Sequence, residues 1–300
     1  MSRFVTPAAF FAAALVARSV LAADGNDDSA GKKSSGYLDV GGSKLYYEEC
    51  GSGPAIVLLH DGLLHSVSWD EIWRPVARKF HVVRYDRRGY GRSEPATSSF
   101  SSIEDLAKLL THLNARHAVV VGSSSGGALA IDFALTHPEM VDGLFLIGPV
   151  LHGMEYTDEF RERAKSNNEP MERDDVRAMA RNWSQDKFLI GGPNEKARRK
   201  IYEQLVANAE KLKNYDSTLE EQLSPPASKR LSEIKTPTLI LAGEADIADV
   251  HAHCDAINAA IYGSSRVVVK GAGHLIQLDK PEEVTRELEE FAERCVRKLD

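Results

Sequence analysis

The chain has 300 residues, of which 43% are hydrophobic and 27% are charged. This composition is typical of a globular protein that buries a large core without disulfide or metal cross-links. Its 37 basic and 44 acidic side chains give a formal net charge of −7. This mild acidity argues against nucleic acid as a partner, because phosphate binding needs a basic face.

Residues 1–23 predict a secretory signal peptide. Arg3 precedes an apolar run from Ala8 to Ala17, and small residues follow before Asp24. This order is typical of a cleavable signal, and the run is too short to span a bilayer of about 30 Å. We therefore expect a secreted or periplasmic protein with no membrane span in the mature chain. A transit peptide is the alternative interpretation.

Residues 24–36, "DGNDDSAGKKSSG", are small and polar, which predicts a disordered leader. The chain has three cysteines, Cys50, Cys254 and Cys295. They allow at most one disulfide, and the sequence leaves open whether any two of them pair. None has the spacing of a metal site, so no metal is expected.

Two short runs, Tyr37–Val40 and Lys44–Glu49, flank a Gly-Gly pair and predict a hairpin at a sheet edge. Six further runs are rich in valine, isoleucine and leucine and mostly do not alternate with polar residues. Continuous apolar runs are typical of parallel strands that helices bury on both faces. These runs are Ala55–His60, His81–Asp86, Ala118–Gly122, Gly143–Gly148, Thr238–Gly243 and Arg266–Gly271.

Between most of these runs the sequence leaves room for one crossover helix. The interval between Gly143 and Thr238 is far longer and requires an inserted segment. We therefore predict an α/β fold with a mostly parallel, doubly wound sheet, its core divided into residues 37–151 and 231–300. A helical cap is expected at residues 152–230. The expected core helices are Trp69–Lys79, Ser101–Ala115, Ser125–His137, Val250–Tyr262 and Pro281–Leu299.

The stretch "VVVGSSSGGALA" places three serines directly between a strand and a helix. A strand that runs straight into a helix needs a sharp turn, and the residues two positions before and after its tip must be small. Only Ser124 has glycine at both positions, Gly122 and Gly126. Ser124 is therefore the candidate nucleophile. A plain Ser/Gly turn is the alternative.

Five motifs in chain order resemble those of the α/β-hydrolase superfamily, from about residue 37 to the C-terminus. They are "LLHDG" at 58–62, "DRRGYGRSE" at 86–94, "GSSSGG" at 122–127, "LAGEAD" at 241–246 and "GAGHLIQLDKPEE" at 271–283. The resemblance implies that an acid and then a histidine follow the serine in the chain. The glycine-rich "DRRGYGRS" stretch is interpreted as a structural turn beside the site.

His274 is the candidate general base, because it follows an apolar run in a glycine-rich loop where ligand sites of α/β folds form. The candidate acids follow the preceding run. The resemblance favours Asp246, with Asp249 as the fallback and Glu244 as a supporting group. His251 and His253 point to different faces of a predicted helix, which disfavours a metal site there.

An oxyanion hole needs two backbone N–H donors. One is expected from Ser125, the residue after the nucleophile. The resemblance places the other at Gly62, with Leu63 as the alternative. Asp61 stands where many relatives carry glycine, so this sequence departs from the family pattern immediately before the second donor.

The resemblance to esterases and enol-lactonases implies an exported serine hydrolase of small carboxylic esters or lactones that needs no cofactor. Ser124 replaces the aspartate of dehalogenases and epoxide hydrolases, and Leu275 replaces the tryptophan typical of carbon–carbon bond hydrolases. The expected pocket residues are Leu63, Met154, Trp183 and Leu275. Apolar residues of the cap, which also include Tyr156, Phe160 and Phe188, form either the pocket or the cap's own core.

Two other functions remain open. The first is an aminopeptidase or amidase on the same catalytic residues, in which Glu155, Asp158 and Glu159 provide an acidic site for an amine. The second is a ligand receptor that keeps the fold without catalysis. The sequence does not determine the oligomeric state.

Overall fold

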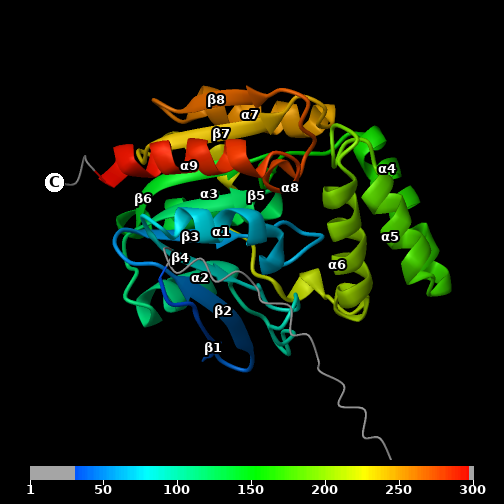
Figure 1. Ribbon diagram of the computed structural model, residues 1–300, viewed down its shortest axis with the longest axis horizontal. Helices are drawn as coiled ribbons and strands as arrows, with labels where there is room; N and C mark the ends of the chain where they lie inside the picture. Colours follow the sequence, from blue (N-terminus) through cyan, green and yellow to red (C-terminus); the bar gives the residue numbers. More distant parts are fainter. Residues whose placement is uncertain (1–30, 297–300) are drawn as a thin grey trace, which may run out of the picture.

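The computed structural model describes residues 31–296, and an eight-stranded sheet lies at its centre (Figure 1). The predicted signal peptide, most of the predicted leader and the last four residues lie outside the described residues. The strands are β1 (Ser34–Asp39), β2 (Lys44–Cys50), β3 (Ala55–Leu59), β4 (His81–Tyr85), β5 (Ala118–Ser123), β6 (Val141–Ile147), β7 (Thr238–Gly243) and β8 (Ser265–Val269).

The order of the strands across the sheet is β1-β2-β4-β3-β5-β6-β7-β8. From β4 to β8 all neighbouring strands are parallel, whereas β2 is antiparallel to both β1 and β4. The predicted α/β fold with a mostly parallel, doubly wound sheet is therefore confirmed. The predicted edge hairpin is β1 and β2, and Gly41 and Gly42 at its turn both have positive φ.

The first strand begins earlier than the sequence predicts. Ser34 is paired with Glu49, and Gly36 is paired with Tyr47. These residues belong to the polar segment 24–36 that was expected to be disordered, so that boundary is wrong at its C-terminal end. Pairing with β2 satisfies the backbone groups of this segment even though its small side chains bury little apolar surface.

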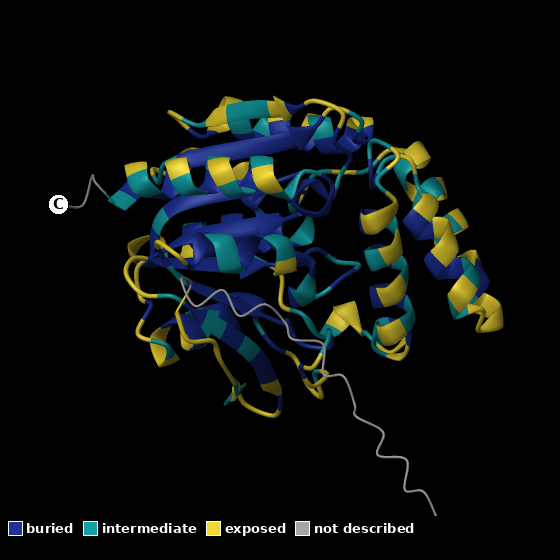
Figure 2. Ribbon diagram, in the orientation of Figure 1, coloured by how far each residue is buried: buried dark blue, intermediate teal, exposed yellow. Residues whose placement is uncertain are grey.

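Helices cover both faces of the sheet. Alternate residues of β5 show this directly. Val120 belongs to an apolar cluster with α2 (Ser102–His112), α3 (Ser125–Thr136) and α7 (Ala248–Ala260), whereas Val119 and Val121 belong to a cluster with α1 (Asp70–Val76) and α9 (Pro281–Val296). In Figure 2 the central strands are accordingly dark blue. The core helices are α1 (Asp70–Val76), α2 (Ser102–His112), α3 (Ser125–Thr136), α7 (Ala248–Ala260), α8 (Ile276–Asp279) and α9 (Pro281–Val296).

Strand β8 differs from the other predicted core strands, because it lies at the sheet edge and is partly exposed. Val268 is 43% exposed, and of the five residues in β8 only Val269 is buried. An apolar run alone does not reveal whether a strand is central or at an edge, and this run is at the edge.

The segment between β6 and β7 is helical and contains α4 (Asp158–Asn168), α5 (Val176–Gln185) and α6 (Glu195–Lys213). These helices stand together at one end of the sheet (Figure 1). They form a third apolar cluster, to which the rest of the chain contributes Leu64, Leu275 and Leu278. The helical segment is therefore fastened to the sheet by apolar contacts close to the end of β3 and to the loop after β8.

No helix within residues 31–296 is both long enough and apolar enough to cross a membrane.

The "DRRGYGRS" stretch is held by a buried ion pair. Arg88 donates to both carboxylate oxygens of Asp105 in α2, at 2.6 and 2.9 Å, and to the carbonyl oxygens of Val40 and Gly41. The side chains of both charged partners are no more than 6% exposed. One guanidinium therefore joins the edge hairpin, the loop after β4 and helix α2.

We predict that Arg88→Met lowers the free energy of unfolding by about 3–5 kcal/mol, because it leaves the Asp105 carboxylate buried without its partner. Urea denaturation followed by circular dichroism measures this. The matched control is Arg161→Met, which breaks an exposed pair with Asp158 and is expected to cost less than about 1 kcal/mol. Equal losses in the two variants would contradict the structural role given to Arg88.

Candidate active site

Ser124 lies at the junction between β5 and α3, in a strained backbone conformation. Its φ is 53° and its ψ is −118°, which a residue with a side chain rarely adopts. The backbone is fixed on both sides: Ser124 N–H donates to Ile147 O, and Ser124 O accepts from the N–H groups of Gly127 and Val150. The strain is thus maintained by hydrogen bonds to β6 and to the loop that follows it.

The two glycines around Ser124 have no room for a side chain. A Cβ on Gly122 would lie 2.3 Å from Gly126 O, and a Cβ on Gly126 would lie 2.4 Å from Leu59 O. Both are backbone atoms, one at the start of α3 and one at the end of β3, and they cannot rotate away as a side chain could. Small residues at both positions therefore allow the helix to start directly beside β3 and leave Ser124 at the tip of the turn.

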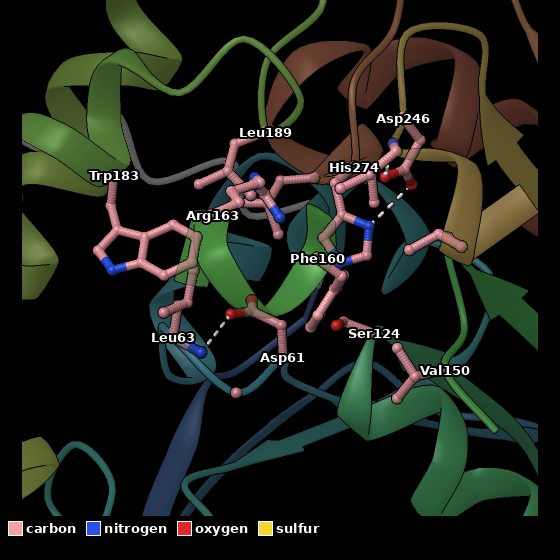
Figure 3. Close-up of a pocket in the computed structure, with 14 residues that line it drawn as sticks. Asp61, Leu63, Ser124, Val150, Phe160, Arg163, Trp183, Leu189, Asp246 and His274 are labelled. Atoms are coloured by element: carbon pink, nitrogen blue, oxygen red, sulfur yellow. Dashed lines mark hydrogen bonds and ion pairs between the residues drawn. The ribbon is translucent and has the colours of Figure 1, made fainter. Parts of the chain in front are cut away.

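Ser124 opens onto a pocket of about 230 Å³ at the end of the sheet, beneath the helical segment. His274 and Asp246 also line it, and Figure 3 shows the His274 ring between Ser124 and Asp246. The structure thus brings together the three residues that the sequence selected, from β5–α3, from the loop after β7 and from the loop after β8. The pocket is lined by Asp61, Gly62, Leu63, Ser124, Val150, Phe160, Arg163, Trp183, Leu189, Asp246, Ile247, Val250, His274 and Leu275.

A hydrogen bond of 2.8 Å joins His274 Nδ1 to Asp246 Oδ2. The side chains are 12% and 1% exposed, respectively. Burial lowers the pKa of His274, but the charge of Asp246 and this hydrogen bond outweigh burial, so the pKa is raised above its ordinary value. The carboxylate therefore stabilises the protonated imidazole and leaves Nε2 as the ring nitrogen available to another group.

The alternative acids have other partners. Asp249 accepts hydrogen bonds from the N–H and the hydroxyl of Thr157, at 2.7 and 2.8 Å. Glu244 accepts one from Gly271 N–H at 2.9 Å. Asp249 therefore fastens the start of the helical segment to α7, and Glu244 supports the loop that carries His274.

The two histidines of α7, His251 and His253, also form hydrogen bonds with other residues. His253 is buried, and its Nδ1 accepts from Leu151 N–H at 3.1 Å, whereas His251 Nδ1 accepts from Arg266 at 2.8 Å. Within residues 31–296, no group of three or more histidine, cysteine, aspartate or glutamate side chains is placed to hold a metal ion.

Gly62 and Ser125 lie next to each other where the end of β3 meets the start of α3. A Cβ on Gly62 would lie 3.2 Å from Ser125 Oγ. In the part of the chain that the structure describes, neither N–H group donates to a protein acceptor. Leu63, the alternative donor, is engaged instead: its N–H donates to Asp61 Oδ1 at 2.8 Å.

The loop with Gly62 is braced by His60 and Arg87. The neutral His60 ring donates from Nδ1 to Asp61 O and accepts from Arg87 N–H at Nε2. Burial and the charge of Arg87 lower the pKa of His60, which favours this neutral form. Arg87 Nη2 donates to Asp61 O and to Ser125 Oγ, both at 2.9 Å. One buried guanidinium thus sets the separation between Gly62 and Ser125.

Three of the four predicted pocket residues line the cavity: Leu63, Trp183 and Leu275. Met154 does not; it packs against the larger apolar cluster of the sheet, because the chain after β6 turns it towards the core before α4 begins. The sequence left open whether Trp183 forms part of the pocket or part of the core of the helical segment. In the structure it belongs to both.

Two charged pocket residues were not singled out as functional by the sequence: Asp61 and Arg163. The departure from glycine at position 61 was the available signal for the first. Arg163 gave no signal, because an arginine in a charged amphipathic helix usually faces solvent.

Comparisons with known proteins agree with this architecture. Residues 54–281 match the family described as "alpha/beta hydrolase fold". The uncharacterized hydrolase YraK of Bacillus subtilis is 33% identical over 144 residues, 44% of this chain, and the match spans only 53% of that relative.

A 2-hydroxy-6-oxo-6-phenylhexa-2,4-dienoate hydrolase of Comamonas testosteroni is 26% identical over 81% of this chain and 88% of its own length. Among solved structures, a thermophilic esterase from Thermogutta terrifontis superposes with a TM-score of 0.70 at 23% identity. That likeness covers 88% of this chain and 99% of the esterase.

We predict that Gly126→Ala lowers the free energy of unfolding by about 1–3 kcal/mol, because the added methyl group collides with the backbone of β3. Chemical denaturation measures the loss. Gly192→Ala is the matched control, since a Cβ there meets nothing within 4 Å and no loss is expected. A Gly126→Ala protein as stable as the control would show that the turn is not tightly packed.

Proposed function

Because the chain belongs to the α/β-hydrolase family, we propose that it is a serine hydrolase that cleaves small carboxylic esters or lactones through an acyl-enzyme. The observation that carries the proposal is the buried Asp246–His274 hydrogen bond in the pocket onto which the strained Ser124 opens. A nucleophile, a base and a group that orients the base are the minimum for this chemistry.

In the proposed mechanism, Ser124 Oγ attacks the carbonyl carbon of the ester while His274 Nε2 accepts the hydroxyl proton. Asp246 holds the ring through Nδ1 and stabilises the imidazolium that forms. The N–H groups of Gly62 and Ser125 bind the oxyanion, and Ser125 at the start of α3 adds the favourable end of the helix dipole. His274 then protonates the leaving alcohol, and water hydrolyses the acyl-enzyme by the same steps.

We further propose that the segment with α4–α6 is the cap that selects the substrate. Phe160, Arg163, Trp183 and Leu189 all come from this segment and line the pocket together with the core residues. A pocket of about 230 Å³ accommodates a small acyl group.

The amidase alternative has less support, because the acids expected to bind an amine lie outside the pocket. Glu155, Asp158 and Glu159, which were to bind an amine, are exposed and do not line the pocket. A carbon–carbon bond hydrolase is disfavoured by Leu275, which stands where those enzymes typically carry tryptophan.

We predict that Ser124→Ala reduces kcat by on the order of 10⁴- to 10⁶-fold on any ester or lactone that the wild type hydrolyses. A panel of nitrophenyl esters and small lactones, assayed with both proteins at equal concentration, measures this. Ser123→Ala is the matched control, because Ser123 Oγ is buried and donates to Gln277 instead of facing the pocket. Equal turnover by wild type and Ser124→Ala would eliminate the mechanism.

The pH dependence follows from His274. Its pKa is raised above the ordinary value of about 6.5, and it acts as a base only when unprotonated. We therefore expect kcat/KM to fall as the pH drops through a value above about 6.5. Asp246→Asn removes the charge that raises the pKa, so the acid limb moves to lower pH and kcat falls by about 10⁴-fold.

The control for this profile is Asp249→Asn, which changes the fallback acid bonded to Thr157. Its acid limb is expected to coincide with that of the wild type. A shift in Asp249→Asn and none in Asp246→Asn would reassign the acid.

A further inference from the structure

Asp61 has a carboxylate oxygen for which the protein supplies no partner. The residue is 2% exposed, and its Oδ1 accepts from the N–H groups of Leu63 and Leu64, both at 2.8 Å. Its Oδ2 is buried and accepts no hydrogen bond from any described residue. Figure 3 shows the carboxylate at the wall of the pocket, between Leu63 and Ser124.

The local turn does not explain this second oxygen. Closing residues 61–64 needs only one acceptor, which an asparagine side chain also provides. Arg87 does not neutralise the carboxylate either, because it donates to the backbone oxygen of Asp61. A buried charged oxygen without a hydrogen bond is unfavourable, so its presence calls for a ligand or another explanation.

Catalysis of ester cleavage does not explain it. The developing oxyanion needs N–H donors, and a carboxylate beside it repels negative charge. Asp61 also acts on the base, since its charge favours the protonated form of His274. The Asp61 carboxylate therefore lies close to the reacting atoms but does not assist the reaction. A hydrogen-bond donor on the substrate would give its free oxygen a partner.

A second residue that lines the same pocket, Arg163, also carries a buried polar atom without a partner. Arg163 is held by Asp186, to which its Nε donates at 2.7 Å, and its guanidinium lies 5.2 Å from the ring centre of Trp183. Its Nη2 is buried and has no acceptor within the described part of the chain. Two residues that line the pocket, Asp61 from the loop after β3 and Arg163 from α4, thus each carry a buried polar atom for which the described protein supplies no partner (Figure 3).

We propose that Asp61 and Arg163 are specificity residues that select an acyl group with a hydrogen-bond donor on the carbon next to the scissile carbonyl. Asp61 directly precedes Gly62, which is to bind the carbonyl oxygen, so its Oδ2 meets the neighbouring substituent of the substrate. Arg163 binds an acceptor on that substituent or beyond it. The substrate class is esters or lactones of 2-hydroxy, 2-amino or N-acylated 2-amino acids, and the inference rests on the proposed function.

Four methyl esters with the same carbon chain test this. Methyl butanoate has no donor, whereas its 2-hydroxy, 2-amino and 2-acetamido derivatives offer a hydroxyl, an ammonium and an amide N–H. For each derivative, kcat/KM is divided by the value for methyl butanoate, in the wild type and in Asp61→Asn. Comparing these ratios between the two proteins cancels the intrinsic reactivity of the esters.

The asparagine side chain in Asp61→Asn keeps an oxygen for the turn and presents an NH₂ group to the pocket. We expect the ratio for at least one derivative to fall by about 10-fold or more in this variant, as a lost hydrogen bond to a charged group predicts. The derivative with the largest fall identifies the donor. The matched control is Asp158→Asn, because the Asp158 side chain is 98% exposed, and its ratios should equal those of the wild type.

Ratios that agree within about twofold between wild type and Asp61→Asn for all three derivatives would overturn the proposal, as would an equal fall in Asp158→Asn. Failure of the proposed function looks different, because the wild type would then hydrolyse none of the four esters. In that case, calorimetric titration of the same esters into Ser124→Ala and Ser124→Ala/Asp61→Asn decides the role of Asp61. Weaker binding of a derivative to the double variant supports it, and equal affinity overturns it.

Discussion

The site depends on one backbone constraint, the positive φ of Ser124 at the junction between β5 and α3. The conformation costs free energy, and it persists because its surroundings admit no other arrangement. Strand β5 lies inside the sheet with both faces buried, and Gly126 presses against the carbonyl groups at the end of β3. The same contact that forces the turn also places the start of α3 beside Gly62, so a single packing interaction positions the proposed nucleophile and the proposed oxyanion donors.

His274, the proposed base, is positioned by the helical segment as well as by the sheet. The backbone N–H of His274 donates to Phe188 O at 2.7 Å, and the backbone N–H of Leu275 donates to Leu189 O at 3.0 Å. Asp279 adds a link between the same two stretches, because its carboxylate accepts from Gly191 N–H and Gly273 N–H. Backbone hydrogen bonds therefore join the residues that line the pocket to the loop that carries the imidazole. In the proposed mechanism, substrate selection and proton transfer depend on the same contacts.

Sequence reasoning succeeded where a short pattern determines the backbone locally. Continuous apolar runs predicted the parallel sheet, and the glycines around Ser124 predicted the tight turn. It failed where long-range contacts decide: residues 34–36 are polar yet paired with β2, and β8 is apolar yet partly exposed. Met154 and Arg163 show the same limit, since the direction of a side chain in the inserted segment depends on how its helices sit on the sheet. The sequence marked Asp61 only as a departure from a family pattern. That its Oδ2 is buried without a hydrogen-bond partner could be learned only from the structure.

In the proposed mechanism, Ser124 forms the covalent intermediate, and its oxyanion lies between the N–H groups of Gly62 and Ser125. A crystal structure of the protein after reaction with a small fluorophosphonate tests it most directly. We expect phosphorus bonded to Ser124 Oγ, with the phosphonyl oxygen about 2.7–3.1 Å from the nitrogens of Gly62 and Ser125. Phosphorus on another residue, or a phosphonyl oxygen directed away from both nitrogens, would contradict it.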